Sequence, residues 1–547
     1  MKKIPKLTFP DLFKNTVKNY GNKNALAFVG ETPIKFKDVE KQILALMAYL
    51  ENLDIKPNDK VAILSTNMPN WGITYFAITF IGAVAVPLLP DFHQSEIENI
   101  LNHSEAKAIF VSKGLSIKIK DIKNNYLKNR IKIEDFSIIE TDHTSKAYNL
   151  EAKPAKEYHV EEDDLATIIY TSGTTGKSKG VMLSHKNISF DAIAAGKVQP
   201  INETDRFLSI LPLSHTYENT LGLILPMIYG ACVYYLRKPP VPAVLLPALK
   251  KVKPTLILSV PLIIEKIYRS KILPSFTDKW YINLLYKIPF VRKKLNLIAG
   301  KKLIQTFGGK VKFFGIGGAK LDKNVEKFLI EAKFPYAIGY GLTETSPLVA
   351  GSNPQNTILQ STGPSVQGIE LKIHNPNKKT KEGEIWVKGP NVMKGYYKEP
   401  ELTKKVLTED GWFKTGDLGT FDKNNFLFIR GRIKNIIVGA SGENIYPEEI
   451  ESVINNFRYV VESVVVQQKG KLVAMVHFNL EEIEKKYQNL RDEATNFIER
   501  KTEDLIKELK IHINTHVNKF SQVQKIILQP IPFKKTATHK IKRYLYY

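Results

Sequence analysis

The segment 170–180 concentrates residues that bind phosphate: three glycines, two lysines and five serine or threonine hydroxyls. Glycine lets the backbone turn tightly and brings its N–H groups close to a ligand. Hydroxyl groups donate hydrogen bonds to phosphate oxygens or bind a magnesium ion, and lysine side chains supply positive charge. This combination predicts a cradle for a polyphosphate. Its candidate ligands are Thr171, Ser172, Gly173, Thr174, Thr175, Gly176, Lys177 and Lys179.

Two other interpretations of this segment are a P-loop and a flexible linker. The P-loop of nucleotide hydrolases has the pattern GxxxxGK[ST], and Gly176-Lys177-Ser178 fits its end. The first glycine of a P-loop would then occupy position 171, where this chain has Thr171, so the spacing fails. A flexible linker rich in glycine and serine is the second alternative. The apolar run at 165–170, which predicts a buried strand, and the lysine pair argue against a linker.

A glycine turn further along the chain could hold a flat ring. A predicted strand at 313–316 ends in Gly317, Gly318 and Ala319. Glycines in such a turn would let a purine lie against the backbone. Asp322 follows as a good N-cap for a predicted helix, which makes the turn a better candidate than an isolated glycine pair.

Two acidic residues could serve a metal ion and a sugar. Glu344 lies in the segment 338–345, and a hard cation prefers carboxylate and phosphate oxygens. Glu344 could therefore contribute to a magnesium site. Asp417, within 412–419, can accept hydrogen bonds from both hydroxyls of a ribose. The alternatives are a helix start with an acidic first turn for 338–345 and an ordinary β-turn aspartate for Asp417.

The elements that must position these residues alternate between strand and helix patterns, which favours a parallel sheet flanked by helices. At 547 residues the chain is too long for one ordinary core, so several domains or subdomains are expected. Residues 61–90 carry no charge. Because polar and helix-breaking residues interrupt them, a buried helix followed by a strand is favoured over a membrane span. Cys232, the single cysteine, leaves no internal disulfide and fits a reducing compartment.

The formal net charge of +24 suits ATP, the phosphates of coenzyme A, an anionic membrane face, an acidic partner or nucleic acid. Nucleic acid ranks last because no zinc finger, RNA-recognition signature or concentrated basic arm is present. A lysine bias of the genome is the alternative explanation for the excess of positive charge.

Residues 271–302 interleave aromatic, aliphatic and basic side chains. This pattern suits an interfacial membrane helix, but Pro289 interrupts any single helix and an ordinary surface helix fits equally well.

Four ordered segments resemble signature motifs of the adenylate-forming enzymes, which include acyl-CoA synthetases, luciferases and peptide-synthetase adenylation domains. They are 170–180, 338–345, 412–419 and 532–543. The resemblance covers the chain from about residue 8 to its end. Three positions depart from the family pattern. They are Ser178 in place of proline, Asn219 in place of arginine and His539 in place of glycine.

The segment 211–219 resembles the substrate-side motif of the same family and contains His215. A glutamate directly after Tyr217, here Glu218, resembles the motif of the long-chain fatty acyl-CoA synthetases in particular. The uncharged run at 221–236 would wall an acyl pocket, and plain core is the alternative.

The resemblance implies a role for each matching residue. Tyr340 stacks on adenine, Thr343 meets the α-phosphate, and Glu344 with Thr174 holds magnesium. Lys540 is the essential lysine and balances charge that grows at the α-phosphate. The implied catalytic set is Lys540, Thr343 and His215. The implied contacts to adenine and ribose, besides Tyr340, are Gly317, Gly318, Ala319, Gly341, Asp417 and Arg432.

The implied fold is α/β, with a large multi-subdomain adenylation domain at 1–433 and a small mobile α+β domain at 434–547 that hinges at Lys434. The implied reaction activates a long-chain fatty acid with ATP and Mg²⁺ through an acyl-adenylate. Coenzyme A then forms the thioester, and pyrophosphate and AMP are released. An acyl-[acyl-carrier-protein] synthetase with the same adenylate chemistry is the alternative.

Two hypotheses from other classes remain open at this point. A non-enzymatic AMP sensor would keep the nucleotide motifs, but the presence of both Glu344 and Lys540 argues against it. A membrane scaffold would use the basic aromatic stretch at 271–302. The expected location is cytoplasmic, with a peripheral position on the inner face of the membrane as an open alternative.

Overall fold

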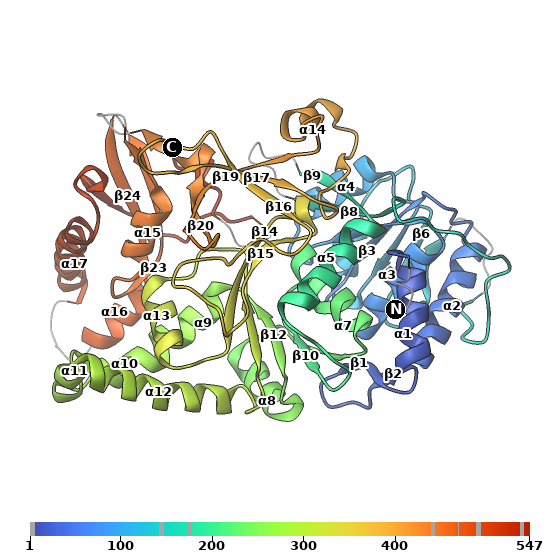
Figure 1. The fold of residues 1–547 in the computed structure, drawn as a ribbon, viewed down its shortest axis with the longest axis horizontal. Coiled ribbons are helices and arrows are strands. Elements are labelled where there is room, and N and C mark those ends of the chain that lie inside the picture. Colours follow the sequence, from blue (N-terminus) through green and yellow to red (C-terminus); the bar gives the residue numbers. More distant parts are fainter. Residues whose placement is uncertain are drawn as a thin grey trace.

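The computed structural model describes residues 6–141, 147–171, 178–438, 443–468, 470–487, 494–536 and 541–547. Two eight-stranded sheets form the larger part of the molecule, and smaller sheets follow toward the C-terminus (Figure 1). Helices cover the large sheets, so the architecture is α/β as predicted.

The sheet that carries the segment 170–180 combines parallel and antiparallel strands. Its strands β8, β4, β3, β5 and β6 run parallel, and β7, β9 and β18 run antiparallel to their neighbours. In sheet order they are β18 (Gly395–Tyr396), β9 (Lys179–Ser184), β8 (Leu165–Thr171), β4 (Val84–Leu88), β3 (Lys60–Leu64), β5 (Ala108–Val111), β6 (Asn129–Lys132) and β7 (Ile138–Thr141). The buried strand expected at 165–170 is therefore confirmed as β8.

The second large sheet is parallel except at its two edge strands, β15 and β2. In sheet order it comprises β15 (Leu348–Gly351), β14 (Tyr336–Gly341), β13 (Phe313–Ile316), β12 (Leu256–Ser259), β10 (Arg206–Ser209), β11 (Cys232–Tyr235), β1 (Asn24–Phe28) and β2 (Ile34–Lys35). Its β13 ends at the glycine turn, and its β14 ends at the segment 338–345, so both candidate motifs lie at the ends of neighbouring strands.

Helices of the N-terminal part pack against these sheets in three hydrophobic clusters. The largest is shared by α1 (Phe9–Tyr20), α2 (Phe36–Asn52), α3 (Pro69–Phe80) and α5 (His185–Val198), a second includes α4 (Gln94–Ser104), and a third includes α8 (Pro242–Val252), α9 (Pro261–Ile267) and α13 (Lys323–Glu331). The buried helix and the following strand predicted within 61–90 are confirmed as α3 and β4, and Trp71 and Tyr75 of α3 are fully buried and stacked. No helix within the described residues is long and apolar enough to cross a membrane.

The predicted cap at Asp322 is also confirmed. Its carboxylate accepts hydrogen bonds from the backbone N–H groups of Asn324 and Val325 at 2.9 and 3.0 Å, and α13 follows. The stretch 271–302 is not one helix. It forms α10 (Leu273–Thr277), α11 (Trp280–Tyr286) and α12 (Pro289–Thr306), and Pro289 opens the last of them.

A four-stranded antiparallel sheet leads toward the C-terminal part. It comprises β16 (Glu370–His374), β17 (Gly383–Lys388), β19 (Phe413–Phe421) and β20 (Leu427–Arg432), and α14 (Pro400–Val406) lies nearby. Beyond β20 come β21 (Ile437–Val438), β22 (Asn444–Ile445), α15 (Pro447–Asn455), β23 (Val460–Gln468), β24 (Lys471–Phe478), α16 (Leu480–Tyr487), α17 (Ala494–His516) and β25 (Lys525–Leu528).

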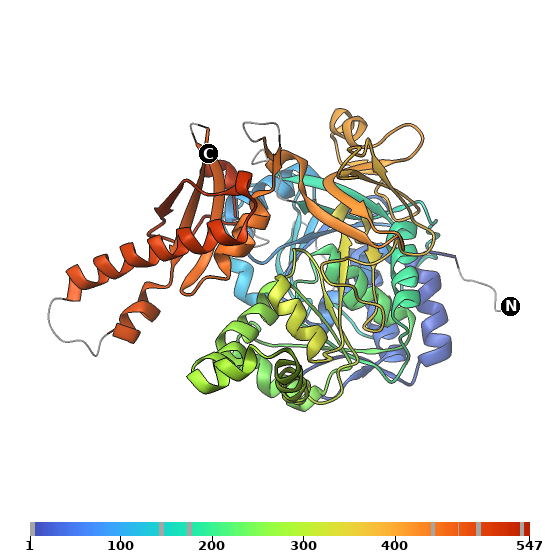
Figure 2. The ribbon, with the colours of Figure 1, turned by 60° about the vertical axis from the view of Figure 1, so that its left-hand side comes forward.

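The C-terminal part has a core of its own, in which α15 and α17 cover the sheet β23-β24-β25. Figure 2 shows this part, in orange to red, beside the larger body, with α17 on its outer side. Contacts with the larger body include the Tyr446 hydroxyl, which donates to Glu382 over 2.9 Å. Arg269 also donates to the backbone oxygen of Asn455 and to the side chain of Asn456.

Candidate nucleotide site

Three residues predicted to contact adenine and ribose meet at one carboxylate. Asp417 on β19 pairs directly opposite Arg432 on β20, and the Arg432 Nε lies 3.1 Å from Asp417 Oδ1. The Tyr340 hydroxyl, which comes from β14 in another sheet, donates to Asp417 Oδ2 over 2.9 Å. Burial, with Asp417 as a further cause, raises the pKa of Tyr340 well above its ordinary value, so this hydroxyl stays protonated. Each oxygen of the buried Asp417 carboxylate therefore faces a hydrogen-bond donor.

A second group forms around Tyr396 on β18. The Tyr396 hydroxyl donates to Glu344 Oε1 over 2.8 Å, and the Met393 N–H donates to the Glu344 carbonyl over 2.9 Å. On the same tyrosine, the Lys179 Nζ lies 5.1 Å from the ring centroid. Burial lowers the pKa of Lys179, and the nearby positive charge of Lys434 lowers it further. The structure thus brings three predicted residues close together: the phosphate ligand Lys179, the metal ligand Glu344 and the hinge residue Lys434.

The turn that presents Glu344 is tightly fixed. Thr343 and Glu344 lie in the short helix η4 (Thr343–Thr345), and Thr343 is partly buried. The Leu342 N–H donates to the Pro347 carbonyl over 3.1 Å. A Cβ atom at Gly341 would lie 1.6 Å from the same carbonyl oxygen, so only glycine fits there. The glycine of this motif is therefore a steric requirement of the turn.

The strands β8 and β9 hold both ends of the predicted phosphate cradle. Thr171, at the end of β8, pairs with Lys179, at the start of β9. The backbone N–H of Tyr397 donates to the Gly180 carbonyl over 2.8 Å, which ties this hairpin to β18 and hence to Tyr396. Six cradle residues lie outside the described part of the chain. They are Ser172, Gly173, Thr174, Thr175, Gly176 and Lys177.

The glycine turn after β13 contacts the substrate-side segment. A Cβ atom at Gly317 would lie 3.2 Å from two ring carbons of Tyr217, so the Tyr217 ring packs on this glycine. Gly318 has a φ of +83°, which favours glycine, and Gly318 and Ala319 are exposed. Sequence reasoning used Tyr217 only as the neighbour of Glu218. Its packing on the turn links the predicted adenine side to the predicted acid side.

His215 and Glu218 have distinct environments. The His215 Nδ1 accepts from the Tyr217 N–H over 3.2 Å and caps the short helix α6 (Thr216–Glu218). Glu218 is buried, and the Ser209 hydroxyl donates to its Oε1. Burial raises the pKa of Glu218 to about 8, against a smaller lowering by the Ser209 hydrogen bond. Glu218 is therefore a neutral acid at neutral pH.

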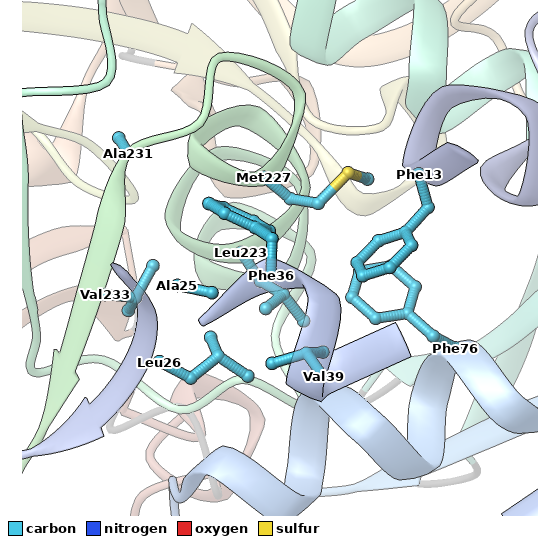
Figure 3. Close-up of a pocket in the computed structure, with 10 residues that line it drawn as sticks. All are labelled: Phe13, Ala25, Leu26, Phe36, Val39, Phe76, Leu223, Met227, Ala231 and Val233. Carbon is cyan, nitrogen blue, oxygen red and sulfur yellow. The ribbon is translucent and has the colours of Figure 1, made fainter. Parts of the chain in front are cut away.

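The uncharged run at 221–236 belongs to the main core. It continues through η2 (Asn219–Ile224), α7 (Leu225–Ile228) and β11, and most of its side chains are buried. Figure 3 shows Leu223, Met227 and Val233 of this run facing Phe13 and Phe36 across a small void. The void, about 10 Å³, is at most large enough for one water molecule and is too small for an acyl chain.

One predicted catalytic residue and the predicted magnesium ion remain to be considered. Lys540 lies outside the described residues. Within the described part, no cluster of three or more histidine, cysteine, aspartate or glutamate side chains could hold a metal ion. A single carboxylate such as Glu344 still fits magnesium, because this ion is commonly bound by one or two carboxylates together with substrate phosphates. Sequence reasoning missed Tyr396, since a tyrosine in a short edge strand carries no motif.

Comparison with known proteins places this geometry in a family. A family model described as "AMP-binding enzyme" matches residues 13–397. The chain is 30% identical to Long-chain-fatty-acid--[acyl-carrier-protein] ligase AEE15, chloroplastic, from Arabidopsis thaliana, over 87% of this chain and 77% of that protein. It is 28% identical to Long-chain-fatty-acid--CoA ligase FadD15 from Mycobacterium bovis, over 94% of this chain and 90% of that protein.

A solved structure shows the same fold. It is o-succinylbenzoate CoA synthetase (MenE) from Bacillus subtilis in complex with the acyl-adenylate intermediate OSB-AMP. The TM-score is 0.77 at 22% identity, and the alignment covers 100% of this chain and 98% of that one. The family model, which matches well over half of the sequence, and the shared fold lead to one conclusion: the chain belongs to the AMP-binding enzyme family.

Proposed function

We propose that this protein activates a long-chain fatty acid with ATP and then joins the acyl group to coenzyme A. In the first step a carboxylate oxygen of the acid attacks the α-phosphorus of ATP. The bond to pyrophosphate breaks, and an acyl-adenylate remains. In the second step the thiol sulfur of coenzyme A attacks the acyl carbon, the thiol proton is lost, and AMP leaves. The observation that carries the proposal is the convergence of Tyr340, Asp417 and Arg432 at one point and of Lys179 and Glu344 at another.

The first group is suited to the nucleoside. A ribose diol can donate to the Asp417 carboxylate, which forms an ion pair with Arg432. The Tyr340 ring would lie beside the adenine, and the turn from Gly317 to Ala319 would supply the backbone surface against it. Fixed donors and acceptors of this kind position a substrate without reorganisation, which is a large part of the catalysis of phosphoryl and nucleotidyl transfer.

The second group is suited to the triphosphate. A carboxylate and a triphosphate repel one another, so the attack needs positive charge along its path. We propose that Lys177, Lys179 and the cradle hydroxyls hold the β- and γ-phosphates, that Thr343 contacts the α-phosphate, and that Lys540 balances its growing charge. Glu344 and Thr174 would hold a magnesium ion, which supplies further charge neutralisation when bound. We place His215 on the acid side.

We further propose that 1–433 and 434–547 are separate domains and that the second rotates about Lys434 between the two steps. Support comes from the separate core of the C-terminal part and from polar contacts such as Tyr446 with Glu382. Lys434 itself is exposed, between β20 and that core.

The proposed location is cytoplasmic. Cys232 is buried and its pKa is raised to about 12 by burial, so no role as a nucleophile is proposed.

An acyl carrier protein is the second candidate acceptor. The relative from Arabidopsis thaliana is named as a ligase for such a carrier, and the net charge of +24 would attract an acidic protein as well as coenzyme A.

One experiment separates these possibilities. ATP–pyrophosphate exchange is measured with acids from acetate to palmitate, and thioester formation is then measured with coenzyme A or phosphopantetheinylated carrier protein. Each buried methylene is worth about 0.8 kcal/mol, so an apolar pocket should favour palmitate by orders of magnitude. Preference for acetate would refute the acid, and product with the carrier alone would establish the second candidate.

A further inference from the structure

The helices α11 and α12 form a hairpin along the lower edge of the molecule in Figure 1. Its inner side is firmly anchored. The Phe276 and Tyr286 rings stack with centroids 4.7 Å apart, and the Tyr286 hydroxyl donates to Asn296 over 2.8 Å. Arg292 forms an ion pair with Glu331 at 2.9 Å. These contacts define the position of the hairpin, so the exposure of its other side is a property of the fold.

The other side of the hairpin exposes large apolar side chains. Trp280 is 79% exposed, Phe290 66% and Leu284 59%. We define the outer face as Trp280, Tyr281, Leu284, Leu285, Ile288 and Phe290. The first four lie on one face of α11, at the spacing i, i+1, i+4 and i+5, and Ile288 lies in the connection to α12. A helix that only covers a core directs its apolar stripe inward, whereas this hairpin carries a second apolar stripe toward solvent.

Four exposed lysines flank the outer face. Lys279, Lys287, Lys293 and Lys294 are exposed, and no ion pair joins any of them to a described residue. The Lys294 Nζ lies 4.3 Å from the centroid of the Phe290 ring. Asp278 is the one acidic residue in the sequence from 271 to 302. Aromatic and aliphatic side chains bordered by lysines are the composition of a surface that binds anionic lipid.

We propose that this hairpin docks the protein on an anionic lipid bilayer. The outer face enters the boundary between headgroups and acyl chains, and the four lysines contact lipid phosphates. The lysines favour an anionic bilayer over a second copy of the chain as the partner of the outer face. A symmetric contact between two copies would bring like-charged lysines together. The inference goes beyond the proposed ligase reaction and does not depend on it.

The apolar part of the proposal is tested by sedimentation of the full chain with vesicles of phosphatidylcholine and phosphatidylglycerol. The double variant W280S/F290S should bind these vesicles at least roughly tenfold more weakly than wild type. The matched control is I511S, which removes an isoleucine that is 67% exposed on α17, and it should bind as wild type does. Because all three side chains are exposed, each variant should keep its fold, and thermal unfolding of each variant verifies this.

The electrostatic part needs a control for net charge, because a protein with a charge of +24 attracts any anionic surface. The variant K293E/K294E should bind roughly tenfold or more weakly, since each lysine near a bilayer contributes about 1 kcal/mol. The control K507E/K510E makes the same change of charge on exposed positions of α17 and should have a much smaller effect. Binding by the wild type should also weaken as salt increases.

Fluorescence gives the position of the hairpin directly. Brominated lipids should quench the tryptophan emission of wild type, and W280F, while still bound to vesicles, should lose most of this quenching. Equal loss of binding in K293E/K294E and K507E/K510E, or unchanged binding of W280S/F290S, would overturn the proposal. Self-association that W280S/F290S abolishes, without any vesicle binding by wild type, would assign the outer face to a second copy instead.

Discussion

The hydroxyl of Ser209 donates a 2.5 Å hydrogen bond to Oε1 of Glu218, which is only 1% exposed. The amide of Asn67 in turn donates to the Ser209 oxygen over 2.9 Å. These three side chains connect the segment before α3, the end of β10 and the helix α6 directly behind Tyr217. The neutral side chain of Glu218 thus helps to hold the segment that carries Tyr217, and Tyr217 packs on Gly317 in the glycine turn.

The first prediction concerns the pH dependence of stability. Glu218 has a pKa of about 8 in the folded protein and an ordinary value of 4.5. Between these values the folded protein holds a proton that the unfolded chain releases, so stability falls as pH rises through this window. Glu218→Gln removes this dependence. Urea unfolding should show the variant gaining about 3 kcal/mol over wild type between about pH 5 and pH 8. Parallel pH profiles would mean that Glu218 is ionised in the folded protein.

A second prediction tests the ribose contact. Asp417→Asn keeps one acceptor but loses the charge that pairs with Arg432. The KM for ATP in the exchange reaction should rise about tenfold to a hundredfold, as expected when a charged hydrogen-bonded pair is broken. The control is Asp422→Asn in the turn after β19, where Oδ1 accepts from the backbone N–H groups of Asn424 and Phe426. An equal rise in KM for both variants would remove Asp417 from the nucleotide site.

A third prediction concerns the metal. Glu344→Gln should lower adenylation by about a hundredfold or more and raise the magnesium concentration needed for half-maximal exchange. Tyr396→Phe leaves the carboxylate in place and removes only its hydrogen bond, so its effect should be smaller. Exchange rates are measured across a magnesium titration. Wild-type behaviour of Glu344→Gln at limiting magnesium would show that this carboxylate does not bind the ion.

The fourth prediction tests the turn at Gly341. Gly341→Ala places a methyl group against the Pro347 carbonyl, and the backbone must move to admit it. The expected loss is about 2–4 kcal/mol in the free energy of unfolding, together with reduced adenylation. Gly114→Ala is the matched control, because a Cβ at Gly114 would have no neighbour within 4 Å. A Gly341→Ala variant as stable as Gly114→Ala would contradict the steric argument.

The fifth prediction separates the two half-reactions. Lys540→Ala should block formation of the acyl-adenylate, whereas thioester formation from supplied acyl-adenylate should continue. The reason is that a rotation about Lys434 would have removed Lys540 from the site before the second step. Both half-reactions are followed separately, with Lys542→Ala as the neighbouring control. Equal loss of both steps in Lys540→Ala would rule out the proposed role.

Much of the local structure could be predicted because its causes are short-range. The strand before the glycine-rich segment, the buried helix within 61–90 and the cap at Asp322 follow from apolar runs, breakers and side-chain acceptors within a few residues. The types of residue in 170–180 and 338–345 likewise indicated phosphate and metal chemistry, because donors, glycines and carboxylates have the same chemistry in any fold.

Only the tertiary structure decided which of these residues meet. Tyr396 reaches Glu344, and Tyr217 reaches Gly317, across separations in the chain that no local pattern encodes. The neutral state of Glu218 depends on burial by several elements at once. For 271–302 the residue pattern was compatible with both an interfacial membrane helix and an ordinary surface helix. Helical spacing defines the stripes but not which one faces the core, and that choice depends on what packs against the helix.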